Sequence, residues 1–189
     1  MNKKLVAALS GGAALMLALT GCSDDSNEKL NDWAKKFCDS GQSQFQQIQD
    51  ANAAMQTADD GNTDSKKIQQ TDSAAFQKIS NAYASLAKSL EKAGPPPTDD
   101  GGQAQKNAVK ELNSLSKGYG DLQKQVDDLN TSDKLKFAEG LRSLSNGIKT
   151  LNAQSEAAFK KLEAGDVGKA MGNQKGCQNQ NASVAPSPS

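Results

Sequence analysis

The sequence predicts an all-α protein, an up-down-up-down four-helix bundle with a C-terminal segment stapled to the first helix. Two observations predict it. Apolar residues recur at spacings of three and four over most of the chain, which is the period of an amphipathic helix. Stretches rich in Gly, Pro, Asn and Asp divide this pattern into four segments of about 30 residues, and short connections between such helices favour an antiparallel bundle.

Residues 1–21 have the pattern of an export signal. Lys3 and Lys4 precede an apolar run over residues 5–19, which is too short for a membrane-spanning helix. The sequence therefore predicts that the protein is exported. A short buried helix is the alternative interpretation of the run.

The apolar run ends in LTGC, residues 19–22, which resembles the lipobox of bacterial lipoproteins. The resemblance implies cleavage between Gly21 and Cys22 and a diacylglyceryl group on the Cys22 thiol, which anchors the chain to the cell membrane. Residues 22–28 are then a lipidated polar tether, and residues 29–177 are the folded domain. An ordinary signal peptide with a spare thiol is the alternative.

The first two helices are expected over residues 27–58 and 64–93, separated by the DDGNTD turn. GPPP at residues 94–97 ends the second helix, because Gly suits a left-handed cap and Pro cannot continue a helix. The apolar stripe of the first helix is Leu30, Trp33, Phe37, Phe45, Ile48 and Met55. That of the second is Ile68, Ala75, Phe76, Ile79, Ala82, Tyr83, Leu86 and Leu90.

The third and fourth helices are expected over residues 103–129 and 134–165. The third has the most regular heptad pattern in the chain. NTSD at residues 130–133 supplies a turn and an N-cap for the fourth. The apolar stripe of the fourth is expected at Leu135, Ala138, Leu141, Leu144, Ile148, Leu151, Ala158, Phe159 and Leu162.

The three cysteines suggest one disulfide. If Cys22 carries lipid, Cys38 and Cys177 remain as a pair in an oxidising compartment. In an antiparallel bundle the fourth helix ends beside the start of the first, so the segment before Cys177 can reach Cys38. Two free thiols are the alternative.

Residues 178–189 have no apolar period and are expected to be a disordered tail.

Trp33 is expected to pack against this disulfide and against Phe159 or Leu162, with a role as a contact anchor for a partner as the alternative.

Asp60, Asn62 and Asp64 stand at alternate positions, as ligands do in a calcium-binding loop. The pattern is incomplete, because Ser65 replaces the usual Gly and Thr71 replaces the usual bidentate Glu. The alternative is a polar turn in which Asp64 caps the second helix. We expect no other metal or cofactor.

Glycines inside the last two long helices suggest either a groove or close packing. Gly118 precedes Tyr119 in the third helix, and Gly140 and Gly147 lie one heptad apart in the fourth. Glycine in a helix interior costs about 1 kcal/mol relative to alanine, so these positions invite a reason. One interpretation is a groove for a partner or apolar ligand with Tyr119 at its wall, and the other is close approach of the two helices.

The composition argues against several classes of function. The chain has no histidine, which removes Ser–His and Cys–His nucleophiles and imidazole metal ligands. The chain has 22 basic residues (Lys and Arg) and 22 acidic residues (Asp and Glu), so it carries no net positive charge that would attract nucleic acid. We therefore expect a protein that is not an enzyme and does not bind nucleic acid.

The layout resembles small helical lipoproteins and secreted proteins of actinobacteria, on the strength of LTGC, of WAKKFC at residues 33–38 and of KGC at residues 175–177. The resemblance implies no established activity. We expect a lipid-anchored binding module on the extracytoplasmic face of the cell membrane, whose partner is an envelope protein or a cell-wall component. The alternative is a carrier that holds a small ligand or lipid in the bundle interior, which would require an enclosed void.

Overall fold

The computed structural model describes residues 21–58 and 63–178 of the 189-residue chain. These residues form helices and no strand, which confirms the all-α prediction. Except for Gly21 and Gln178, the expected leader and tail lie outside the described residues. The helices are α1 (Gly21–Ala58), α2 (Ser65–Ala93), α3 (Gly101–Asp127), α4 (Lys134–Leu162), α5 (Gly165–Gly172) and α6 (Lys175–Gln178).

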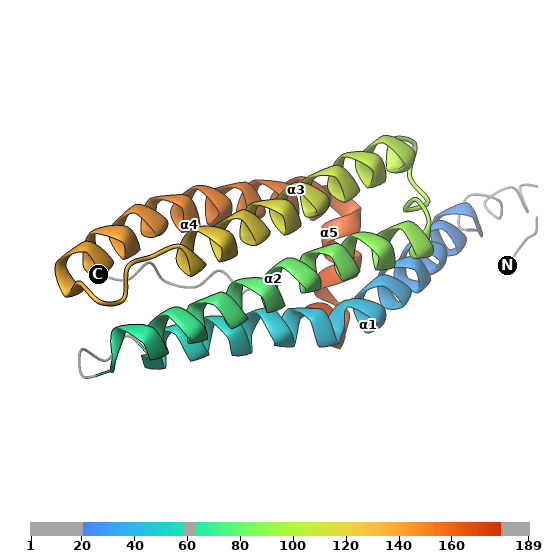
Figure 1. Ribbon diagram of the computed structural model, residues 1–189. Helices are drawn as coiled ribbons and strands as arrows, with labels where there is room; N and C mark the ends of the chain where they lie inside the picture. The colour runs from blue at the N-terminus through green and yellow to red at the C-terminus, as the bar shows by residue number, and fades with distance from the viewer. Residues whose placement is uncertain (1–20, 59–62, 179–189) are drawn as a thin grey trace, which may run out of the picture.

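The helix α2 is central, because it packs against both α1 and α3, whereas α4 packs chiefly against α3. Figure 1 shows α1 beside α2 and α3 beside α4, with α5 crossing at one end. Large, fully buried side chains fill the space between the first three helices: Phe37, Phe76, Ile79, Leu86, Leu90, Leu112, Leu115 and Val126. Burying each such side chain contributes about 1.5–3 kcal/mol.

The helix α1 begins at Gly21, six residues before the expected start, so the polar stretch after Cys22 is helical rather than an extended tether. Asp25 and Glu28 lie in its first turns, where carboxylates interact favourably with the positive end of the helix dipole. Residues 25–29 are exposed to solvent. The folded domain is thus continuous with a solvated helical extension.

The start of α4 differs from the expected stripe. Leu135 is 79% exposed, and Phe137, which the stripe omitted, is 3% exposed. The buried stripe runs through Phe137 and Leu144 to Ser155, with Gly140 and Gly147 between them. Ala138, also expected in the stripe, is exposed, because it follows Phe137 by one residue and so lies on a different side of the helix. From Leu141 onwards the expected stripe is confirmed at Leu141, Leu144, Ile148, Leu151 and Phe159, which are in or against the core.

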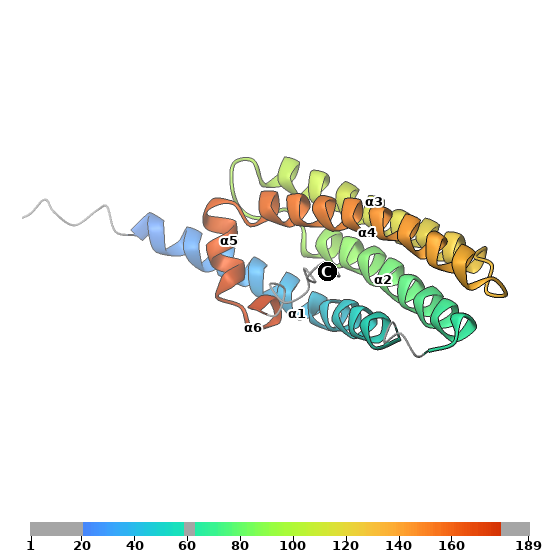
Figure 2. The same cartoon turned by 90° about the vertical axis from the view of Figure 1, so that its left-hand side faces the viewer.

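The segment after α4 contains two short helices that the sequence analysis did not predict. Gly165 adopts a φ of 66°, which turns the chain out of α4, and α5 then crosses to α1 (Figure 2). Its buried residues Val167, Ala170 and Met171 have helical spacing. A helix of eight residues with only three buried apolar residues gives too short a periodic pattern to be recognised from the sequence.

The disulfide between Cys38 and Cys177 joins α1 to α6, as predicted, with the two Cα atoms 5.1 Å apart. Gly176 makes this approach feasible, because a Cβ there would collide with the backbone carbonyl of Cys38. Both cysteines are buried. The disulfide therefore fixes α6, and with it α5, against the first helix.

Trp33 is buried, as expected for an interior residue, and its ring and indole N–H contact Phe37 and Gly94. Its ring stacks on Phe37 with centroids 6.0 Å apart, and its indole N–H donates to the Gly94 carbonyl at 2.8 Å. Phe159 pairs instead with Phe45, edge to face. Trp33 thus ties α1 to the end of α2.

Candidate functional site

The interface between α3 and α4 has a closed half, in which leucines of one helix pack on glycines of the other. Leu151 lies against Gly118, Leu122 against Gly147, and Leu129 against Gly140. At all three glycines an added Cβ would come within 3.0 Å of the leucine side chain. These pairs fill the position of the groove considered from the sequence, so the close-packing interpretation describes this region.

The three glycine–leucine pairs share one antiparallel register. Steps of four and then seven residues, from Gly118 through Leu122 to Leu129 just after the end of α3, are matched by equal steps in the reverse direction along α4. Spacings of four and seven return to nearly the same helix face, so one stripe of each helix supplies every contact. The interior glycines allow the two helices to approach closely over this length. We name this region the glycine–leucine seam.

A layer of tyrosine hydrogen bonds follows the seam. The rings of Tyr83 and Tyr119 stack with centroids 5.6 Å apart. The Tyr119 hydroxyl donates to Asn152 Oδ1 at 3.0 Å, and the Tyr83 hydroxyl lies 3.0 Å from Ser155 Oγ. Burial raises the pKa of both tyrosines well above the ordinary value, so both remain protonated and neutral at physiological pH. Tyr119 is therefore an interior residue and not the wall of a groove.

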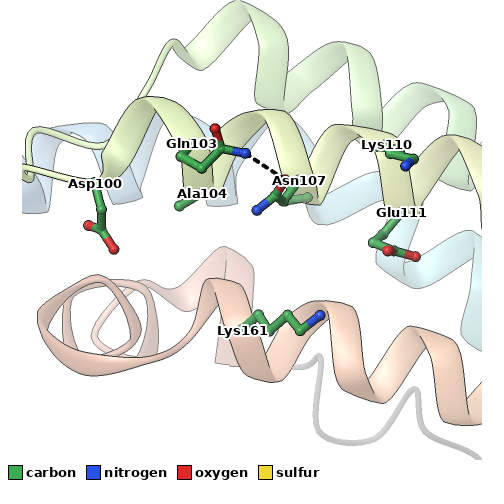
Figure 3. A pocket seen from close by; sticks show the side chains of 8 residues that line it. Asp100, Gln103, Ala104, Asn107, Lys110, Glu111 and Lys161 are labelled. Carbon is green, nitrogen blue, oxygen red and sulfur yellow. Dashed lines mark hydrogen bonds between the residues drawn. The ribbon is translucent and has the colours of Figure 1, made fainter.

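Beyond the tyrosine layer, the α3–α4 interface holds a polar cleft of about 440 Å³. The first half of α3 forms one wall and the end of α4 forms the other (Figure 3). Its volume lies within the range of about 300–1,000 Å³ that is common for small-ligand sites. The residues that line the polar cleft are Asp100, Gln103, Ala104, Asn107, Ala108, Lys110, Glu111 and Lys161.

The α3 wall is positioned by the turn that precedes the helix. Gly101 is buried against the Pro96 carbonyl, where any Cβ would collide with the backbone. The close approach places Asp100, the N-cap residue, at the end of the cleft. The other lining residues follow at helical spacings of three and four, so they share one face of α3.

The α4 wall is positioned by an aromatic contact. The Phe159 ring packs edge to face on Phe45 of α1, with centroids 6.2 Å apart. Successive residues of a helix are separated by about 100°, so Lys161 projects from nearly the opposite side of α4. Figure 3 shows the Lys161 side chain across from the stretch between Asn107 and Glu111.

The charged groups of the polar cleft are balanced in sign, with two carboxylates and two ammonium groups. Within the described part of the chain, Lys110, Glu111 and Lys161 form no ion pair. The ion pairs that are present are local contacts on single helices, such as Lys117–Asp121, whose hydrogen bond lowers the pKa of the Asp121 carboxyl. Cleft charges are thus accessible to a ligand.

Two neighbouring polar groups modify this environment. The Gln103 side-chain amide donates to Asn107 Oδ1 at 2.8 Å, which orients both amides along the same edge of α3. Glu163, the C-cap residue of α4, does not line the cleft, and desolvation raises the pKa of its carboxyl. The polar cleft therefore combines amides with charges of both signs.

The calcium candidate is not assembled within the described residues. Asp60 and Asn62 lie outside them, and Asp64 caps α2 by accepting hydrogen bonds from the Lys66 and Lys67 backbone N–H groups. The described residues contain no cluster of three or more potential protein ligands for a metal. The capping interpretation of Asp64 is confirmed.

The sequence analysis missed the polar cleft because its residues carry no catalytic or metal-binding motif. The available signal was the alternation of amides, charges and alanines on one face of α3, next to an apolar stripe.

No helix among the described residues has the length and apolar character needed to cross a membrane. No protein-family model, curated protein or solved structure matches the chain.

Proposed function

We propose that this protein is a lipid-anchored module of the cell envelope that binds a polar partner through its polar cleft, without catalysing a reaction. The lipobox-like LTGC supports cleavage after Gly21 and acylation of Cys22. The Cys38–Cys177 disulfide supports an extracytoplasmic location, because such bonds persist in oxidising compartments. Two or more acyl chains would hold the protein stably on the membrane.

We also propose that the four long helices form an up-down-up-down bundle. The packing of each long helix on the next supports this arrangement, as do the short connections between them. In this arrangement the start of α3 and the end of α4, which line the polar cleft, lie at the same end as the first turns of α1 (Figure 1). A ligand in the cleft would therefore be held near the membrane surface.

The observation that carries the binding proposal is the set of accessible, unpaired charges in a concave site, Glu111 on one helix and Lys161 on the other. A carrier function is less well supported, because large side chains such as Phe37, Phe76 and Leu112 fill the interior between α1, α2 and α3. The absence of histidine from the sequence supports a function in binding rather than hydrolysis.

The binding proposal is tested by site-specific photocrosslinking in intact cells. A photoreactive residue replaces Ala104 in the polar cleft, or Asn113, an exposed residue of α3 outside it. We expect a defined adduct from position 104 that is lost with Lys161→Met, and none from position 113. Equal adducts at both positions, or no adduct at position 104, would refute binding through the cleft.

The anchoring proposal has a separate readout from the same cells. Mass spectrometry of the membrane fraction should find an N-terminal Cys22 that carries a diacylglyceryl group. The Cys22→Ala variant should not be cleaved after Gly21. An unacylated chain recovered from the cytosol would refute anchoring without affecting the result at position 104.

A further inference from the structure

We propose that the polar cleft recognises a short zwitterionic peptide, with the ligand ammonium at Asp100 and the ligand carboxylate at Lys161. This inference rests on the proposed binding function and specifies its ligand. The starting observation is that the cavity holds Asp100 at one end and Lys161 on the opposite wall, whereas Lys110 and Glu111, which are adjacent in α3, offset each other in charge. A ligand that satisfies both must carry an amine and a carboxylate some distance apart.

The geometry of α3 sets the length of that ligand. Figure 3 places Asp100 at one end of the polar cleft and Lys161 across from the stretch that begins at Asn107. Asn107 lies seven positions after Asp100, which corresponds to a rise of about 10 Å along a helix. An extended peptide spans about 3.3–3.6 Å per residue, so about three residues fit between the charged groups.

The remaining lining residues suit a peptide backbone. Gln103 and Asn107 supply amide groups that can both donate and accept hydrogen bonds, as peptide groups require. Ala104 and Ala108 have short side chains, which leave space for the ligand main chain between the helices. No bulky apolar residue lines the polar cleft, so selectivity for a large apolar side chain is not expected.

Glu111 makes the site less favourable for multiply charged anions than for a single carboxylate. Figure 3 shows its carboxylate on the α3 wall facing the same region as Lys161. A multiply charged anion such as phosphate, bound at Lys161, would be repelled by this carboxylate. A single peptide carboxylate carries less negative charge than phosphate, so this repulsion is weaker for it.

The test is calorimetric titration of the purified protein with trialanine. We expect saturable one-to-one binding, weakened at least about tenfold by N-acetylation or by C-terminal amidation of the peptide, because each removes one charge-assisted contact. Asp100→Asn should abolish the preference for a free amine, and Lys161→Met should abolish the preference for a free carboxylate. Lys160→Met is the matched control, since Lys160 is exposed on α4 next to Lys161 but does not line the cleft.

Three outcomes would overturn the peptide proposal. They are absence of trialanine binding to the native protein, equal binding of capped and free peptides, and equal losses for Lys160→Met and Lys161→Met. Circular dichroism and thermal unfolding of each variant establish that the fold is retained. If the cleft-specific crosslink at position 104 persists while trialanine fails to bind, the proposed function stands and the ligand class is wrong.

Discussion

The two halves of the α3–α4 interface differ in what lies between the helices. In the glycine–leucine seam, Gly118 and Gly147 each receive a leucine from the opposite helix and Gly140 receives Leu129, which lies just after α3. In the polar cleft, the α3 wall presents amides and charges, and Lys161 faces them across open space. The same pair of helices therefore forms a packed core contact at one end and a candidate binding site at the other.

This difference shows how a helix pair can separate stability from recognition. The seam fixes the register of α4, and the Tyr83–Ser155 and Tyr119–Asn152 hydrogen bonds fix its rotation. The remaining turns of α4 are then free to carry exposed polar residues. Packing at one end positions the wall of the cleft at the other.

The largest effect is expected from removing the staple with Cys38→Ser and Cys177→Ser together. The chain-entropy model predicts a loss of about 5 kcal/mol for a loop of this length, whose ends are 139 residues apart in sequence. Chemical denaturation of the double variant and the oxidised native protein measures this loss.

Because α5 joins the stapled segment to α4, amide exchange should increase more at residues 155–162 than at residues 140–151. A uniform increase would contradict the role of the staple in supporting the cleft.

Phe137→Ala should have the next largest effect, a loss of about 3–5 kcal/mol, because it leaves a cavity at the start of the buried α4 stripe. Leu135→Ala is the matched control and should change stability by less than about 0.5 kcal/mol, since its side chain is exposed. Denaturant unfolding of both variants gives the comparison. Equal losses would show that the α4 register described above is incorrect.

The α4 register also shows what the sequence could and could not predict. Helical period and breaker residues located all four long helices, and the odd cysteine count identified the disulfide. The apolar period also predicted most of the α4 stripe, from Leu141 to Phe159, and failed only in the first turns, at Leu135 and Ala138. The function of Gly140 and Gly147 became visible only with their partners, Leu129 just after α3 and Leu122 within it.

The polar cleft could not be predicted for a different reason. Its lining residues, such as Asp100, Asn107 and Lys161, are ordinary for a solvated helix face when considered singly. They form a site only because α3 and α4 face each other across an open space. That separation is a property of tertiary packing, and local sequence patterns do not encode it directly.

Raising the pH above 10 should weaken the tyrosine layer between the two halves. Tyr83 and Tyr119 have raised pKa values in the folded state, so the unfolded chain loses its phenolic protons first. Their stabilising contribution is complete well below pH 10 and is lost as the pH rises above 10, because the phenols of the unfolded chain then ionise while those of the folded protein stay protonated. Unfolding free energies at pH 9 and pH 11 measure this loss. The Tyr83→Phe, Tyr119→Phe double variant should lack this component, and an identical pH dependence in both proteins would contradict the assignment.

Gly118→Val should give a smaller loss, about 1–3 kcal/mol, because the new side chain overpacks the seam against Leu151. Gly102→Val is the control, since no heavy atom lies within 4 Å of a Cβ added there. Thermal and denaturant unfolding distinguish the two variants. If Gly118→Val were as stable as the control, the seam would not be closely packed.

The most direct measurement of the division between seam and cleft is a map of backbone amide shifts of the isotope-labelled protein during titration with trialanine. Binding at the open half predicts changes concentrated at residues 100–111 and around Lys161, with little change at residues 118–129 and 140–151. Changes concentrated in the glycine–leucine seam, or spread evenly over the surface, would contradict it.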